Sequence, residues 1–128
     1  MQVGEAYLVP SGPNNKKHLH VVIVDPDENG SCIWVNICSV QENVYYDESC
    51  EFVGGEHKFI KHHSYVAYNF MFYVHSVHVE RMVRLNAFMK EEDLKPRFLQ
   101  KILDGLYETI EAPKGVLADC KGRLKRMK

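Results

Sequence analysis

The chain has 128 residues, 45% of them hydrophobic and 26% charged, with a formal net charge of −1 at pH 7. This length suits one domain with a single core, and no apolar run approaches the roughly 18 residues that a membrane span needs. The four cysteines follow no repeated spacing and no signal peptide opens the chain, so we expect reduced thiols, a cytoplasmic location and no membrane partner.

The first 24 residues predict two strands separated by a loop. Residues 5–9 form a short strand candidate that a proline ends, and the turn-rich stretch 10–15 predicts a flexible loop. Residues 19–24 contain an unbroken Val-Val-Ile-Val run, which is typical of a central strand that is covered on both faces.

A hairpin follows, because Asn29-Gly30 favours a tight turn and residues 31–40 form a returning strand. Side chains alternate along a strand, so this segment has two distinct faces. The more apolar set is the expected core face and consists of Ile33, Val35 and Ile37. The other face carries Cys32, Trp34, Asn36 and Cys38.

The second half begins with strands and ends with a helix. Residues 65–79 are rich in aromatic and β-branched side chains, which favours one or two strands over a helix. The acidic run 91–93 suits the start of a short helical turn, and Pro96 suits the first turn of the next helix. Apolar residues then recur at spacings of three and four, as an amphipathic helix requires: Phe98, Leu99, Ile102, Leu103, Leu106 and Ile110.

These elements predict a mainly β fold, a small barrel or strongly bent sheet that is closed by one C-terminal amphipathic helix. The domain is expected to cover residues 1–112. Residues 113–128 are expected to form a basic, flexible tail, because residues 121–128 contain five lysines and arginines and no acidic residue. Such a tail suits contact with nucleic acid or an acidic partner, or simple exposure to solvent.

Three of the seven histidines fall in the stretch 54–65, which starts with Gly54-Gly55, a pair that permits a sharp bend. Histidine exchanges protons near neutral pH, and Lys58 and Lys61 add positive charge beside His57, His62 and His63. These groups could supply the base, the acid and the cation that RNA cleavage without a metal needs. The same histidines also fit surface positions or hydrogen-bonded structural positions.

Zinc binding is an alternative for this stretch. Cys50, His57 and His62 or His63 offer the sulfur and nitrogen ligands that zinc accepts. Their spacing matches no compact zinc module and the chain has no Cys-x-x-Cys pair, so the main hypothesis includes no metal or other cofactor.

The order of features resembles the MazF/PemK toxins, in the superfamily of Kid and CcdB, from type II toxin–antitoxin systems. The resemblance covers residues 3 to about 110 and rests on segment order: Val3-Gly4-Glu5-Ala6-Tyr7-Leu8-Val9, the apolar strand at 20–24, Trp34-Val35-Asn36-Ile37-Cys38-Ser39, Ser64-Tyr65-Val66, Val79-Glu80-Arg81-Met82-Val83 and the closing helix. It implies an SH3-like barrel, a homodimer, a cognate antitoxin partner and metal-independent endoribonuclease activity, or gyrase as the target in the CcdB branch.

The resemblance also marks two positions at which the chain departs from the family pattern. Lys17 or His18 stands where the ribonucleases have an arginine, and Cys38 or Ser39 stands where they have a threonine. The histidine stretch therefore becomes the candidate source of acid and base groups.

The main hypothesis is a divergent toxin of this family that binds single-stranded RNA and is a candidate endoribonuclease. The candidate catalytic residues are His57, His62, His63, Ser64 and Lys17. The candidate RNA-binding residues are Lys16, Lys17, Lys58, Lys61 and Trp34, with Tyr45 or Tyr46 as further rings for stacking. The alternatives are an SH3-like module that binds a protein without catalysis, and a zinc-binding domain with Cys50, His57 and His62 as ligands.

Overall fold

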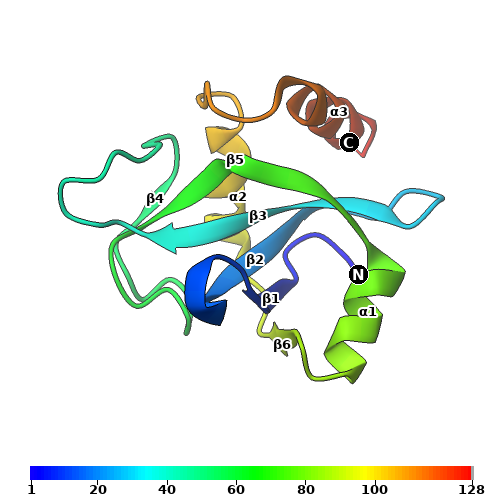
Figure 1. Ribbon diagram of the computed structural model, residues 1–128. Coiled ribbons are helices and arrows are strands. Elements are labelled where there is room, and N and C mark those ends of the chain that lie inside the picture. Colours follow the sequence, from blue (N-terminus) through cyan, green and yellow to red (C-terminus); the bar gives the residue numbers. More distant parts are fainter. Residues whose placement is uncertain (128) are drawn as a thin grey trace.

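Six antiparallel strands form one sheet in the computed structural model, which describes residues 1–127 (Figure 1). The strands are β1 (Ala6–Pro10), β2 (Lys17–Val24), β3 (Ser31–Ser39), β4 (Glu51–Phe52), β5 (Ser64–His75) and β6 (Met89–Glu91). Their order across the sheet is β4-β5-β3-β2-β1-β6. The expected strands at 5–9, 19–24 and 31–40 and the hairpin at Gly30 are confirmed.

The sheet is open. Within residues 1–127 the strand pairs run in a single row, and the edge strands β4 and β6 do not pair with each other. The expectation of a closed barrel is therefore wrong. A bulge in β5 opposite β3, between the pairs Trp34↔Phe72 and Asn36↔Ala67, interrupts the ladder at its centre.

One face of the sheet is covered by two helices, α2 (Pro96–Gly105) and α3 (Lys114–Arg126). Ile33, Val35 and Ile37 of β3 lie on this face as expected, together with Val21 and Ile23 of β2. All five side chains are buried, so this helix-covered face holds the larger core of the protein.

Helix α2 begins at Pro96, as expected from the tolerance of proline in a first turn. Ile102 and Leu106 of the predicted apolar stripe are fully buried, whereas Ile110 lies beyond the helix and is 94% exposed. The helix ends at Gly105, where an added Cβ would collide with the Tyr68 hydroxyl, so a side chain has no room at this approach to β5.

Helix α3 occupies the segment that we expected to be a flexible tail. Its apolar residues Val116, Leu117, Cys120 and Leu124 pack on the helix-covered face. The guanidinium of Arg123 donates hydrogen bonds to the carbonyls of Asp25 (2.8 Å) and Ser31 (2.6 Å). The tail interpretation is wrong for residues 114–126, because an apolar stripe lies among the basic residues that dominated the composition.

A third helix, α1 (Ser76–Arg84), replaces the strand expected up to residue 79, and it lies on the other side of the sheet from α3 (Figure 1). The His75 side chain caps α1 by accepting a hydrogen bond from the Val77 amide at 3.1 Å. The acidic run 91–93 does not start a helical turn, because Glu91 pairs with Ala6 in the sheet. The expectation of a single helix is therefore wrong.

The four cysteines are free thiols, and three of them are buried. Among residues 1–127 no helix combines the length and the apolar character that a membrane crossing requires.

Candidate functional site

The second face of the sheet is only partly covered. Helix α1 packs on one end of it, where Val79 contacts a small apolar cluster that includes Val22, Trp34 and Val74. The same face carries a cavity of about 770 Å³, which we call the aromatic groove. Its lining consists of Val9, Pro10, Ser11, Gly12, Pro13, His18, His20, Trp34, Asn36, Cys38, Phe70, Phe72, Tyr73, Val74, His75, His78 and Phe88.

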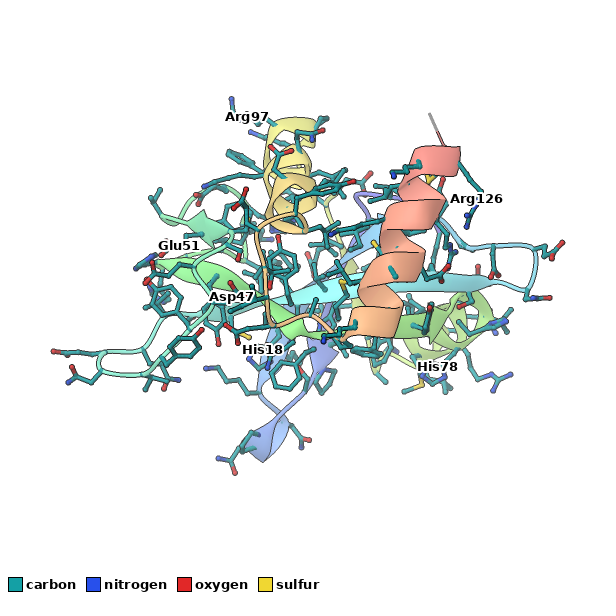
Figure 2. The ribbon with its side chains drawn as sticks, turned by 90° about the horizontal axis from the view of Figure 1, so that it is seen from above. His18, Asp47, Glu51, His78, Arg97 and Arg126 are labelled. Atoms are coloured by element: carbon teal, nitrogen blue, oxygen red, sulfur yellow. The ribbon has the colours of Figure 1, made fainter. Side chains whose placement is uncertain are left out.

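Seen from above, His18 of β2 and His78 of α1 lie on one side of the sheet and Arg97 of α2 on the other (Figure 2). The groove is thus on the face that α2 and α3 leave uncovered. Among the rings that line it, Phe70 is 56% exposed, and Phe72 and Tyr73 are each 44% exposed. A loop with the short 3-10 helix η1 (Pro13–Asn15) borders the groove at the end of β1.

Three adjacent polar side chains, His20, Trp34 and Asn36, form the floor of the aromatic groove. His20 and Asn36 face each other across β2 and β3, and the rings of His20 and Trp34 are 4.8 Å apart between centroids. Burial lowers the pKa of His20 to about 4, so the ring is neutral at pH 7. Its Nδ1 donates to the His18 carbonyl at 3.1 Å, since a carbonyl oxygen only accepts.

Two polar atoms of this floor have no hydrogen-bond partner among the residues that the structure describes. They are Trp34 Nε1 and Asn36 Oδ1, and both are sealed from solvent. A buried polar atom without a partner costs about 1–3 kcal/mol, so native proteins rarely keep one without a ligand, a water or another role.

Trp34 does not offer an open ring for stacking, contrary to our expectation. It is 2% exposed, because the rings of Tyr7, His20, Phe72 and Phe88 surround it. Phe70 and Phe72 are the rings that a ligand meets first.

His18 lines both the aromatic groove and a second cavity, of about 300 Å³, which we call the basic pocket. The His18 Nδ1 lies 2.7 Å from the Ser11 hydroxyl. Burial and then the nearby Lys16 lower the pKa of His18 below its usual 6.5. A neutral imidazole with a positioned hydroxyl beside it is suited to accept a proton at pH 7.

The basic pocket brings together five of the residues that the sequence singled out, although they come from two distant segments. Lys16 and Lys17 approach it from the start of β2, and Lys61, His62 and Ser64 approach it from the start of β5. Cationic groups in one concave site favour a phosphate or another anion. The Ser64 hydroxyl, however, donates to the His62 carbonyl at 2.7 Å and is buried.

His57 lies apart from the basic pocket, in a structural position. Its Nε2 donates to the Glu92 carbonyl at 2.7 Å, and its Nδ1 accepts from the Phe59 amide at 3.1 Å. Both nitrogens are therefore occupied, and the ring is 5% exposed. These contacts tie the bend at 54–60 to the end of β6 and do not support a role in proton transfer.

His63 and Lys58 are not among the residues that line the basic pocket. His63 Nε2 lies 2.8 Å from a Glu51 carboxylate oxygen, which also accepts a hydrogen bond from the Tyr46 hydroxyl. The Lys58 ammonium lies 5.5 Å from the centre of the Phe59 ring. The two adjacent histidines therefore have different surroundings, and both precede β5, which begins at Ser64.

The zinc ligands that the sequence suggested do not come together. Cys50 is buried in the core of the helix-covered face, where burial raises its thiol pKa to about 11. Residues 1–127 contain no group of three or more His, Cys, Asp and Glu side chains placed to hold a metal ion.

The sequence did not point to Phe70, Phe72, His20 or Asn36 as site residues. The alternation of residues 31–38 placed Asn36 on the less apolar face, which was a usable signal. For Phe70 and Phe72 the signal was an aromatic-rich strand without charged side chains, which looked like core.

Compared with protein-family models, with curated proteins and with solved structures, the chain gives no significant match. The resemblance to MazF/PemK toxins thus rests on the order of sequence features.

Proposed function

We propose that the protein binds single-stranded RNA, with bases in the aromatic groove and phosphates at the basic pocket. The observation that carries this proposal is that His18 lines both cavities. An aromatic surface beside a row of cations is what an unpaired strand needs, because its bases stack on rings while its phosphates meet positive charge.

The groove favours a single strand over a duplex. Only an unpaired base can leave its neighbours and lie against the exposed rings of Phe70 and Phe72. Lys16, Lys17 and Lys61 then neutralise the phosphates that follow it. The protein carries a formal net charge of −1, so these local cations, rather than the overall charge, attract the RNA.

The proposal includes descent from the MazF/PemK toxins, in the form of an SH3-like sheet that has opened. The position of the family's arginine falls at Lys17 or His18, and both side chains line the basic pocket. A homodimer and an antitoxin partner belong to the same proposal, as does a cytoplasmic location.

Cleavage of the bound RNA is a second candidate function, and the presence of His18 and His62 in one pocket favours it. Neutral His18 would take the proton of a 2′-hydroxyl, whose oxygen attacks the adjacent phosphorus. His62 would give a proton to the departing 5′-oxygen, leaving a 2′,3′-cyclic phosphate and a 5′-hydroxyl. This assignment replaces His57 and His63 with His18, because only His18 and His62 line the basic pocket.

Binding is tested by fluorescence anisotropy with a labelled 12-nucleotide RNA, offered as a single strand and as a duplex. We expect the single strand to bind more tightly. Phe70→Ala should weaken that binding by about 5- to 150-fold, the loss of one stacked base. Tyr107→Ala is the matched control, since Tyr107 is 60% exposed on the side of α2. Equal affinity of the two variants would contradict the proposal, as would a preference for the duplex.

Cleavage is tested by incubating the same RNA with the protein in EDTA and separating the products. His18→Ala should abolish product formation while leaving binding in place, and His63→Ala should leave both unchanged. Intact RNA with the parent protein would remove the enzymatic function and leave the binding function standing. Binding of an apolar peptide in the groove, with none of RNA, would favour the protein-interaction module instead.

A further inference from the structure

The floor of the aromatic groove presents one donor and two acceptors to a ligand. The donor is Trp34 Nε1, which has no partner among residues 1–127. The first acceptor is Asn36 Oδ1, because the other amide atom, Nδ2, is directed at the Cys38 sulfur at 3.9 Å. The second acceptor is His20 Nε2, because the proton of this ring is on Nδ1, which donates to a carbonyl.

These three groups are fixed and uncharged. His20 and Asn36 are cross-strand neighbours on adjacent central strands, and the Trp34 ring lies against the His20 ring. The pKa of about 4 keeps His20 neutral, and therefore an acceptor at Nε2, across the physiological pH range. The ligand that satisfies this floor is flat, enters among aromatic rings, and offers two N–H donors beside one acceptor.

Nucleobases differ in this respect. Adenine and cytosine each carry an exocyclic amino group with two N–H donors beside a ring nitrogen that accepts, and guanine offers N–H donors beside its carbonyl oxygen. Uracil in RNA has one N–H between two carbonyl oxygens. A uracil on this floor would leave one acceptor without a donor.

We propose that Trp34, Asn36 and His20 form a base-reading site that accepts the amino-bearing nucleobases adenine and cytosine and discriminates against uracil. This inference rests on the RNA binding proposed above and adds its specificity. It assigns a function to the two unpartnered buried atoms, which the structure otherwise leaves unexplained.

The ring of Phe72 controls access to the site. It contacts Trp34 edge-on, with centroids 6.1 Å apart and planes at 83°, and it is 44% exposed. A half-exposed ring can change rotamer, and such changes are common when a ligand binds. The base would enter by displacing this ring, which then stacks on the base.

The test uses four RNA octamers that differ at one central position. This position is uridine, cytidine, adenosine or purine riboside, and all other positions are uridine. Purine riboside is adenosine without its amino group, so this pair isolates that group, and cytidine against uridine does so for the smaller ring. With the full-length protein we expect cytidine to bind at least about fivefold more tightly than uridine, and adenosine to exceed purine riboside by a similar factor.

Asn36→Leu removes the acceptor at nearly constant volume. We expect this variant to lose both preferences while its affinity for the all-uridine octamer changes less than twofold. Asn69→Leu makes the same chemical change at an exposed position outside the groove and should keep both preferences. Trp34→Phe, which removes the donor with part of the indole but keeps an aromatic ring, is the second variant if Asn36→Leu does not fold.

The outcomes separate the inference from the function on which it rests. Equal affinity for all four octamers would overturn the base-reading site and leave RNA binding standing. A uniform loss across all octamers in Asn36→Leu would also overturn it, because that pattern indicates a structural role. Failure of every octamer to bind would refute RNA binding itself, and the specificity with it.

Discussion

The two faces of the sheet place their apolar side chains in different settings. On the helix-covered face, α2 and α3 close over aliphatic residues, and Ile33, Val35 and Ile102 are fully buried. The opposite face carries the aromatic groove, and we call it the aromatic face. There α1 covers one end only, and Phe70 and Phe72 stay about half exposed. The polar atoms differ as well, because both unpartnered buried atoms belong to the aromatic face.

This difference indicates that the two faces have different roles, one in stability and the other in ligand binding. Burial of aliphatic side chains stabilises the fold, since each such side chain contributes about 1.5–3 kcal/mol when it leaves water. Exposed aromatic rings and unsatisfied polar atoms contribute little or oppose folding, and they are typical of ligand sites. Stability should therefore depend mainly on one face, and ligand binding on the other.

The largest expected effect is on the helix-covered face. Ile102→Ala should lower the free energy of unfolding by about 2–5 kcal/mol, because it leaves a cavity beneath α2. Ile110→Ala, at a position that is 94% exposed, should change it by less than about 0.5 kcal/mol. Urea denaturation of both variants measures the two values. Similar losses would show that the helix-covered face is not the main stabilising core.

The next effect is the dependence of stability on pH through His20 of the aromatic face. Its folded pKa of about 4 lies below the unfolded value of 6.5, so the unfolded chain binds the extra proton as the pH falls. Stability is then complete above pH 6.5 and declines down to about pH 4. The difference in pKa corresponds to about 3 kcal/mol.

The free energy of unfolding of the parent protein should fall between pH 7 and pH 4, as measured by urea denaturation at each pH. In His20→Gln this fall should be smaller, because the variant lacks the contribution of His20. His62→Gln, at an exposed position, is the control and should follow the parent protein. A loss in His20→Gln as steep as that of the parent would mean that the aromatic face does not keep this histidine neutral.

A smaller effect is expected from the cations of the basic pocket. Replacing Lys16 and Lys17 with alanine should weaken RNA binding at all sequences and lower the slope of log affinity against log salt by about 1 for each lysine. Lys114 and Lys125 belong to α3, on the helix-covered side, and are the control pair. A titration of affinity between low and high salt gives both slopes. Equal slopes for the two double variants would show that the lysines of the basic pocket do not contact RNA phosphates.

The sequence predicted the helix-covered face well and the aromatic face poorly. The alternation in residues 31–38 and the spacing of three and four in α2 are local patterns. They are confirmed by the burial of Ile33, Val35 and Ile37 and of Ile102 and Leu106, whereas Ile110 is exposed. The open sheet, in contrast, depends on pairs between distant strands, such as Ala6 with Glu91. No local pattern encodes such pairs.

The candidate site was missed for a similar reason. His57 is of a residue type that often catalyses proton transfer, but its Nε2 is hydrogen-bonded to the carbonyl of Glu92, 35 residues away. His18 and His62 lie 44 residues apart along the chain, and yet both line one pocket. Helices α1 and α3 were misjudged because the strand-forming residues before His75 and the basic charge after residue 120 outweighed shorter local signals.

The smallest expected effect on stability is also the most direct test that the aromatic face serves ligand binding rather than stability. Phe70→Ala removes a ring that is 56% exposed and lies outside both buried clusters, so the free energy of unfolding should change by less than about 0.5 kcal/mol. The same substitution should weaken RNA binding by at least about fivefold. Thermal or urea denaturation gives the first number and anisotropy gives the second. A large loss of stability with unchanged RNA affinity would reverse the assignment, because the aromatic face would then act as a core whose cover is missing.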